Sequence, residues 1–101
     1  MKKILNSTVD YVDEMLAGLV AAHPENYRLH GDTGKVVARA KSESKGKVGI
    51  VSGGGSGHLP VFTGYVGEGL LDACAIGAVF SSPSAEQMAD AIRAADQGKG
   101  V

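Results

Sequence analysis

A run of three glycines followed by a histidine is the part of this chain best suited to chemistry. Residues 51–60 read Val-Ser-Gly-Gly-Gly-Ser-Gly-His-Leu-Pro, and an apolar segment leads into them. Glycines let the backbone approach a ligand closely and adopt positive φ angles, and consecutive N–H groups without side chains over them form a cradle for an oxygen or an anion. His58 stands beside this cradle, where an imidazole is placed for proton transfer. The pattern therefore predicts a binding loop.

Other sites built on glycines or histidines fit these residues poorly. A P-loop requires a lysine after its last glycine, and none follows here. The third glycine of a dinucleotide fingerprint would fall on His58, and so would the last glycine of a nucleophile elbow centred on Ser56. His23, His30 and His58 lack the spacing of metal ligands, so we expect no metal site on this chain.

Composition describes an ordinary single domain. The chain has 101 residues, of which 44% are hydrophobic and 21% charged, and its formal net charge is -1. Its basic residues are dispersed, which argues against binding to nucleic acid or to an anionic membrane. Its apolar runs are shorter than the roughly 18 residues that suggest a membrane span. We expect a cytoplasmic protein that handles a small molecule, with its single cysteine, Cys74, packed in the core.

The first expected element is a helix near the N-terminus, between Ser7 and His23. Ser7 is placed to begin it, with Asp10 in the reciprocal capping position. His23 before Pro24 should end it, because a residue before proline avoids the α region. The apolar positions recur on one helical face, namely Val9, Val12, Leu16, Leu19 and Val20.

Three strands are expected around the loop. Val36–Ala38 forms the first, and Val48–Val51 forms the second, which delivers the glycines. A charged surface turn at residues 41–46 should separate these two. The third strand lies within Leu70–Phe80, and its uninterrupted apolar pattern indicates burial on both faces of a mainly parallel sheet.

A second helix should follow the third strand. Ser82, or Ser84 with Gln87 three residues later, provides its N-cap. Its buried stripe should contain Met88, Ala91, Ile92 and Ala95, and residues 96–98 should end it. In an α/β layer such a helix is followed by a returning strand. We therefore expect residues 1–101 to be the N-terminal portion of one longer α/β domain, truncated at residue 101 and with no second domain in the chain.

The loop and several flanking motifs resemble the substrate-binding subunit or domain of the dihydroxyacetone kinase family. The resemblance is carried by an ordered set along essentially the whole chain: Met1–Asn6, Leu16–Leu19, His23-Pro24, Ser52–Pro60, Gly64–Gly67, Gly69, Phe80, Ser82-Pro83 and Gly98–Val101. It corresponds to about the first third of the family's substrate domain.

The resemblance implies phosphoryl transfer to a hydroxyl of a short-chain ketose such as dihydroxyacetone, in glycerol and carbohydrate metabolism. In the family, the residues matching Gly55, Ser56, Gly57 and His58 hold the oxygens of the substrate. The histidine that matches His58 also helps to deprotonate the hydroxyl that receives the phosphate. Gly54 either contacts the substrate or serves only the backbone geometry.

The same resemblance places the phosphoryl donor elsewhere. Family members receive it from a separate nucleotide-binding subunit or domain that carries ATP or ADP with Mg, so no cofactor is expected on this chain. A second histidine, a lysine and an aspartate of the family would lie after Val101, and residues 1–101 alone should therefore be inactive. The family's substrate subunits commonly form homodimers.

One position departs from the family pattern. Leu59 stands where the family usually has a glutamate between the histidine and the proline. If this side chain sets the polarity of the pocket, the substrate is a different ketose, for example a four-carbon one such as erythrulose. The alternative is a non-catalytic paralogue that binds a ketose and reports it to a regulator.

Overall fold

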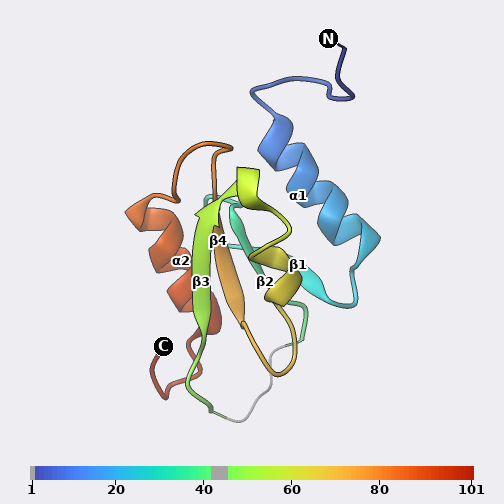
Figure 1. The fold of residues 1–101 in the computed structure, drawn as a ribbon. Helices are drawn as coiled ribbons and strands as arrows, with labels where there is room; N and C mark the ends of the chain where they lie inside the picture. The colour runs from blue at the N-terminus through green and yellow to red at the C-terminus, as the bar shows by residue number, and fades with distance from the viewer. Residues whose placement is uncertain (1, 42–45) are drawn as a thin grey trace.

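The computed structural model describes residues 2–41 and 46–101 and contains a four-stranded sheet packed against helices (Figure 1). The strands are β1 (Tyr27–His30), β2 (Val36–Arg39), β3 (Val51–Gly55) and β4 (Ala73–Gly77). The helices are α1 (Tyr11–Ala22) and α2 (Ala85–Ala95), together with the 3₁₀ turns η1 (Ser56–His58) and η2 (Thr63–Tyr65). The α/β class is confirmed. The charged turn expected at residues 41–46 falls largely on residues 42–45, which lie outside the described residues.

The sheet is mixed, with its strands in the order β1-β2-β4-β3. β3 and β4 run parallel, whereas β1 pairs with β2, and β2 with β4, in antiparallel directions. The expectation of a mainly parallel sheet is therefore wrong for two of these three pairings. One of these two pairings comes from a hairpin that the sequence did not reveal, in which Gly31 and Gly34 turn the chain between β1 and β2 with φ angles of 85° and 66°. A turn this short joins antiparallel neighbours.

Alternating side chains on β2 and β4 build an apolar layer on each face of the sheet. One layer contains Val36, Ala38, Ala73, Ala75, Ala91 and Ala95, the last two from α2. The other contains Leu16 from α1 together with Val37, Val66, Leu71, Cys74 and Ile76. α1 and α2 accordingly lie on opposite sides of the sheet in Figure 1. Cys74 is buried as predicted, and its burial raises the pKa of the thiol to about 12.

α1 begins later than the sequence predicts. Its N-cap is Asp10, whose side chain makes no capping hydrogen bond, and the Ser7 hydroxyl accepts a hydrogen bond from the N–H of Val9 at 3.2 Å. The predicted capping pair is therefore wrong, because Ser7 closes a local turn ahead of the helix. Leu16 is buried as expected, but Val9 lies outside the helix and is 86% exposed. The C-cap is His23, where the helix was expected to end.

α2 begins with the predicted capping box. The N–H of Gln87 donates to the Ser84 hydroxyl at 3.1 Å, and the N–H of Ser84 donates to the side-chain oxygen of Gln87 at 2.7 Å. Ala91 and Ala95 are buried as expected, whereas Ile92 is 45% exposed. The small side chains of β2 and β4 meet the alanines of α2, and this contact leaves Ile92 at the margin of the buried stripe.

Candidate functional site

The glycine triplet lies in a strand rather than in a loop. Gly53, Gly54 and Gly55 pair in parallel with residues 75–77 of β4, and the chain turns only at Ser56. None of these glycines, nor Gly57, has a positive φ angle. The expected loop therefore begins three residues later than predicted. A need for positive φ angles does not explain why glycines occupy these positions.

Close packing against the segment after β4 requires two of the glycines. A Cβ atom on Gly55 would lie 3.1 Å from the carbonyl oxygens of Ala78 and Ser81, and one on Gly57 would collide with the carbonyl oxygen of Val79. The backbones also bond directly, since the N–H of Ser56 donates to Ala78 at 3.0 Å and that of Gly57 to Val79 at 3.1 Å. These two N–H groups therefore cannot form the open cradle that the sequence predicted.

A surface hollow of about 240 Å³ lies between η1 and the segment after β4. The exposed side chain of His58 stands at its rim. One wall, η1, follows the carboxyl end of β3, and the other, residues 78–82, follows the carboxyl end of β4. The carboxyl ends of neighbouring parallel strands are the usual position of ligand sites in α/β sheets. The lining residues are Gly55, Gly57, His58, Val79, Phe80, Ser81 and Ser82.

The remaining site candidates from the sequence, Gly54 and Ser56, are not among these lining residues. Ser56 is 7% exposed, and its hydroxyl has no hydrogen-bond partner among the described residues. The structure thus brings Gly55, Gly57 and His58 together around the hollow and sets Gly54 and Ser56 behind them.

The imidazole of His58 contacts one aromatic ring, that of Phe62. The rings of His58 and Phe62 lie edge to face, with their centroids 6.5 Å apart and an interplanar angle of 84°. Phe62 is itself half-buried and packs against the apolar layer that contains Leu16 and Ile76. Phe62 could not be selected from its position in the sequence, because a phenylalanine four residues after a histidine is not a site motif.

Leu59 faces the core rather than the hollow. It is partly buried and packs against the same apolar layer as Phe62, and it does not line the hollow beside His58. The hypothesis that Leu59 changes the polarity of the pocket is therefore wrong for this hollow.

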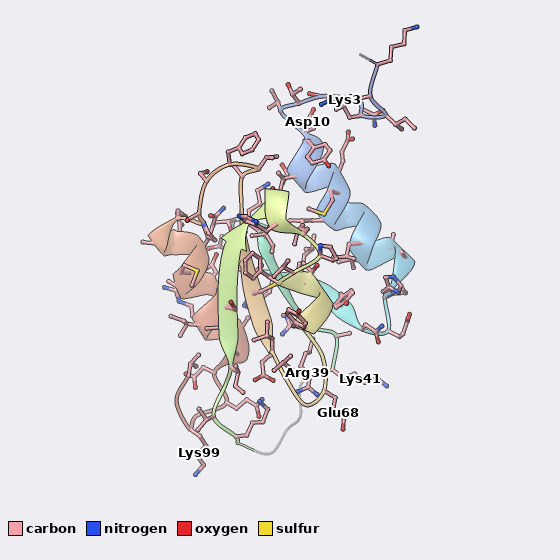
Figure 2. The ribbon with its side chains drawn as sticks, viewed as in Figure 1. Lys3, Asp10, Arg39, Lys41, Glu68 and Lys99 are labelled. Atoms are coloured by element: carbon pink, nitrogen blue, oxygen red, sulfur yellow. The ribbon has the colours of Figure 1, made fainter. Side chains whose placement is uncertain are left out.

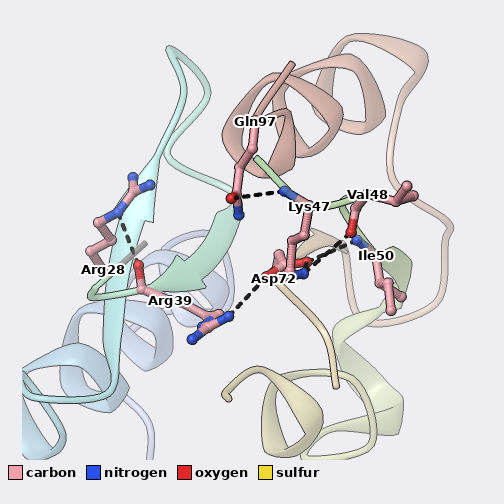
Figure 3. Close-up of polar contacts among 7 residues, drawn as sticks. All are labelled: Arg28, Arg39, Lys47, Val48, Ile50, Asp72 and Gln97. Atoms are coloured by element: carbon pink, nitrogen blue, oxygen red, sulfur yellow. Dashed lines mark hydrogen bonds and ion pairs between the residues drawn. The ribbon is translucent and has the colours of Figure 1, made fainter. Parts of the chain in front are cut away.

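A buried carboxylate, Asp72, lies at the opposite end of the parallel strand pair (Figure 3). It accepts hydrogen bonds from the Arg39 guanidinium at 3.0 Å, from the Lys47 ammonium, and from the N–H of Ile50 at 2.9 Å. Burial by itself would raise the pKa of Asp72, but the Lys47 ammonium, a backbone N–H and the Arg39 guanidinium outweigh it and hold this pKa below its ordinary value of 3.8. These contacts make Asp72 a structural anchor.

A second hollow, of about 340 Å³, lies at the end of the sheet near this anchor and remote from η1. Arg39, Lys41 and Glu68 line it, and Figure 2 shows them at the end of the molecule opposite the turn that carries His58. Its mixed charges give no preference for one class of ligand.

The other histidines are engaged elsewhere. His23 packs edge to face on Tyr27, and the Nδ1 of His30 lies 2.8 Å from the Arg28 guanidinium. Within residues 2–41 and 46–101, no group of three or more His, Cys, Asp or Glu side chains is arranged to hold a metal ion. No helix in this part of the chain has the length and apolar character needed to cross a membrane.

Comparison with curated proteins gives clear relatives. The dihydroxyacetone-binding subunit DhaK of PTS-dependent dihydroxyacetone kinase 1 from Listeria innocua is 51% identical over 102 residues, covering 100% of this chain and 30% of that protein. L-erythrulose 1-kinase from Mycolicibacterium smegmatis is 43% identical over 101 residues, covering 100% of this chain and 17% of that protein. The chain thus spans less than a third of the length of either relative.

Solved structures share the fold. The dihydroxyacetone kinase operon co-activator Dha-DhaQ has a TM-score of 0.77 and 39% identity, covering 87% of this chain and 26% of that one. The dihydroxyacetone kinase from C. freundii, in complex with AMP-PNP and Mg²⁺, has a TM-score of 0.82 and 32% identity, covering 94% of this chain and 18% of that one.

A family model described as the Dak1 domain matches residues 17–101. The resemblance to the substrate-binding part of dihydroxyacetone kinases is thereby confirmed, and the chain belongs to the Dak1 domain family.

Proposed function

We propose that this chain is the ketose-binding N-terminal part of a dihydroxyacetone-type kinase. In its complete form the protein transfers a phosphoryl group to a hydroxyl of dihydroxyacetone or of a four-carbon ketose such as erythrulose. The observation that carries the proposal is the exposed imidazole of His58 at the rim of a hollow formed by two parallel strand ends. Relatives named as a dihydroxyacetone-binding subunit and as an erythrulose kinase support the two substrates.

In this proposal His58 acts as a general base. Its imidazole accepts the proton of the ketose hydroxyl as that oxygen attacks the phosphoryl group, which is the task of a base within hydrogen-bond reach of the acceptor. Gly55 and Gly57 leave the floor of the hollow free of side chains, so the ketose can approach the backbone. The hydroxyls of Ser81 and Ser82 on the facing wall are suited to bind its other oxygens.

Gly54 and Ser56 take supporting positions in the same proposal. The hydroxyl of Ser56 has no partner among the described residues, and Ser56 stands between the lining glycines Gly55 and Gly57 in sequence. A change of the Ser56 side-chain rotamer on ligand binding would offer this hydroxyl to a substrate oxygen. Gly54 serves the backbone geometry.

The phosphoryl donor is proposed to come from a nucleotide-binding subunit or domain that carries ATP or ADP with Mg. The C. freundii structure contains AMP-PNP and Mg²⁺, and the Listeria relative is named as one subunit of a kinase. We extend the proposal to a cytoplasmic homodimer, and to inactivity of residues 1–101 on their own, as the family resemblance implies.

A coupled phosphorylation assay tests this function. It uses the full-length protein with its nucleotide-binding partner and compares dihydroxyacetone with erythrulose. The His58→Ala variant should lower kcat by about 10²–10⁴-fold, the range for loss of a general base. The control is His23→Ala, because His23 is exposed and packs on Tyr27. Turnover of His58→Ala equal to that of the native protein would remove His58 from the mechanism.

A second candidate is a ketose-binding regulator. The 39% identity to a structure named as an operon co-activator favours it, since the same fold carries that role there. Calorimetric titration with dihydroxyacetone separates the two. Binding without phosphorylation, in the presence of the nucleotide-binding partner, would indicate the regulator, whereas turnover would indicate the kinase.

A further inference from the structure

We infer that Phe62 is a positioning residue for His58, which it holds through a ring contact in the orientation needed to meet the ketose hydroxyl. The inference rests on the proposed function of His58 and assigns a role to a side chain outside the glycine-rich turn. Its starting point is the edge-to-face contact, whose centroid distance of 6.5 Å lies within the range of favourable aromatic pairs.

This contact is what fixes the imidazole. Among the described residues, His58 makes no side-chain hydrogen bond, and its ring meets a defined partner in Phe62. The remaining surface of His58 is exposed at the rim of the hollow. Without the phenyl ring the imidazole would be free to change rotamer in water, and a base that is misplaced by about 1 Å can lose about 10²-fold in rate.

The phenyl ring is in turn held from two directions. On one side it packs against the buried layer that contains Leu16 and Ile76. On the other side it lies over Gly54, where an added Cβ atom would collide with the ring. The middle glycine of the triplet thus leaves room for Phe62, which explains a glycine that lines no part of the hollow.

The backbone fixes the spacing between the two aromatic side chains. The N–H of Val61 donates to the carbonyl of His58 at 3.1 Å, and the N–H of Tyr65 donates to the carbonyl of Phe62 at 3.2 Å. His58 and Phe62 therefore each begin one of two successive hydrogen-bonded turns, so the backbone on which both rings stand is ordered, and the phenyl ring that packs on the core holds the imidazole.

The kinetic experiment uses full-length protein and three variants. Phe62→Leu removes the ring but keeps an apolar side chain, whereas Phe62→Tyr keeps the ring. The control is Tyr65→Leu, which changes a half-exposed aromatic side chain on η2. Phe62→Leu should lower kcat about tenfold with KM changed less than twofold. Phe62→Tyr and Tyr65→Leu should keep the native kcat. A raised KM with native kcat in Phe62→Leu would overturn the inference, because Phe62 would then contact the substrate.

A double-mutant cycle tests the part assigned to Gly54. If Gly54→Ala acts by displacing the ring, it should lower kcat in the native background and change it less than twofold in the Phe62→Leu background. Additive losses would mean that Gly54 acts independently of Phe62 and would overturn this part.

An NMR measurement reads the contact without reference to turnover. The native protein should show a nuclear Overhauser effect between the ring protons of His58 and Phe62, and Phe62→Leu should increase the mobility of the imidazole. An equally ordered His58 in Phe62→Leu would overturn the inference even if the protein is a kinase. A native protein that shows the contact but phosphorylates no ketose would refute the proposed function and leave the positioning contact in place.

Discussion

Asp72 and Ile50 bond to each other twice. The Ile50 N–H donates to the Asp72 carboxylate at 2.9 Å, and the Asp72 N–H donates to the Ile50 carbonyl at 2.8 Å. A side-chain oxygen here takes the part of a backbone carbonyl and extends the pairing of β3 with β4 beyond the regular strands. The Lys47 and Arg39 side chains neutralise this carboxylate (Figure 3).

Asp72→Asn should destabilise the folded protein by about 1.5–3 kcal/mol, because a neutral amide loses the charge-assisted hydrogen bonds that the buried carboxylate accepts from Arg39 and Lys47. Chemical denaturation monitored by circular dichroism would measure the loss. Asp32→Asn is the control, since Asp32 is exposed in the β1–β2 turn. Equal stabilities of the two variants would contradict the anchoring role.

Acid should have the same effect as this substitution. The folded pKa of Asp72 lies below its ordinary value of 3.8, so the unfolded chain binds the proton more readily. The stabilisation is therefore complete above that value and is lost as the pH falls below it, through the folded pKa. Comparing unfolding at pH 7 and pH 3 should show a smaller decrease in stability for Asp72→Asn than for the native protein.

Gly57→Ala should destabilise the turn that carries His58, by about 1–3 kcal/mol, because the new methyl group would press on the Val79 carbonyl. Gly18→Ala is the matched substitution, since nothing lies within 4 Å of the added Cβ atom in α1. It should stabilise the protein by about 0.5–1 kcal/mol through helix propensity. Thermal unfolding of both variants checks this prediction, and a shift of the same sign in both would contradict it.

Leu59→Glu should affect stability more than substrate choice. The side chain packs against the core layer and lies outside the hollow, so a carboxylate would disturb apolar contacts rather than the ketose. The ratio of kcat/KM for dihydroxyacetone and erythrulose should change less than twofold while the melting temperature falls. A large change in this ratio would show that residue 59 reaches the substrate.

Ser84→Ala should destabilise α2 by about 1 kcal/mol, because it removes one half of a capping box. Ser7→Ala should have little effect, since the Ser7 hydroxyl closes only a local turn before α1. Denaturation of the two variants tests the assignment. A larger loss for Ser7→Ala would reverse it.

Local sequence patterns predicted those parts of the fold that depend on near neighbours. The capping residues Ser84 and Gln87 stand three positions apart, and the apolar run around Cys74 is continuous, so each reveals its role directly. β1 was missed because it has only four residues, Tyr-Arg-Leu-His, and so short an alternation of apolar and polar residues does not indicate a strand by itself. The missed hairpin accounts for the antiparallel pairing of β1 with β2, whereas the antiparallel pairing of β2 with β4 joins strands that are far apart in the sequence, where no local pattern sets the direction.

The candidate site shows the same division. His58 was found because a histidine after consecutive glycines is a recognisable pattern, and the structure places it at a hollow. The roles of the glycines were not predictable, because Gly54 and Gly57 are explained by Phe62 and Val79, which approach them only in three dimensions. The spacing of residues in the sequence does not indicate that a side chain at position 57 would collide with the carbonyl of Val79.

The hydrogen bonds that join Ser56 to Ala78 and Gly57 to Val79 also limit how the hollow can adapt. These bonds join η1 to the segment after β4 at two successive residues, so neither wall can move outward alone. The spacing of β3 and β4 in the sheet therefore sets the width of the hollow. A longer sugar must therefore be accommodated by a side chain. Phe80, which is fully exposed on the wall facing His58, is the group with the freedom to rotate.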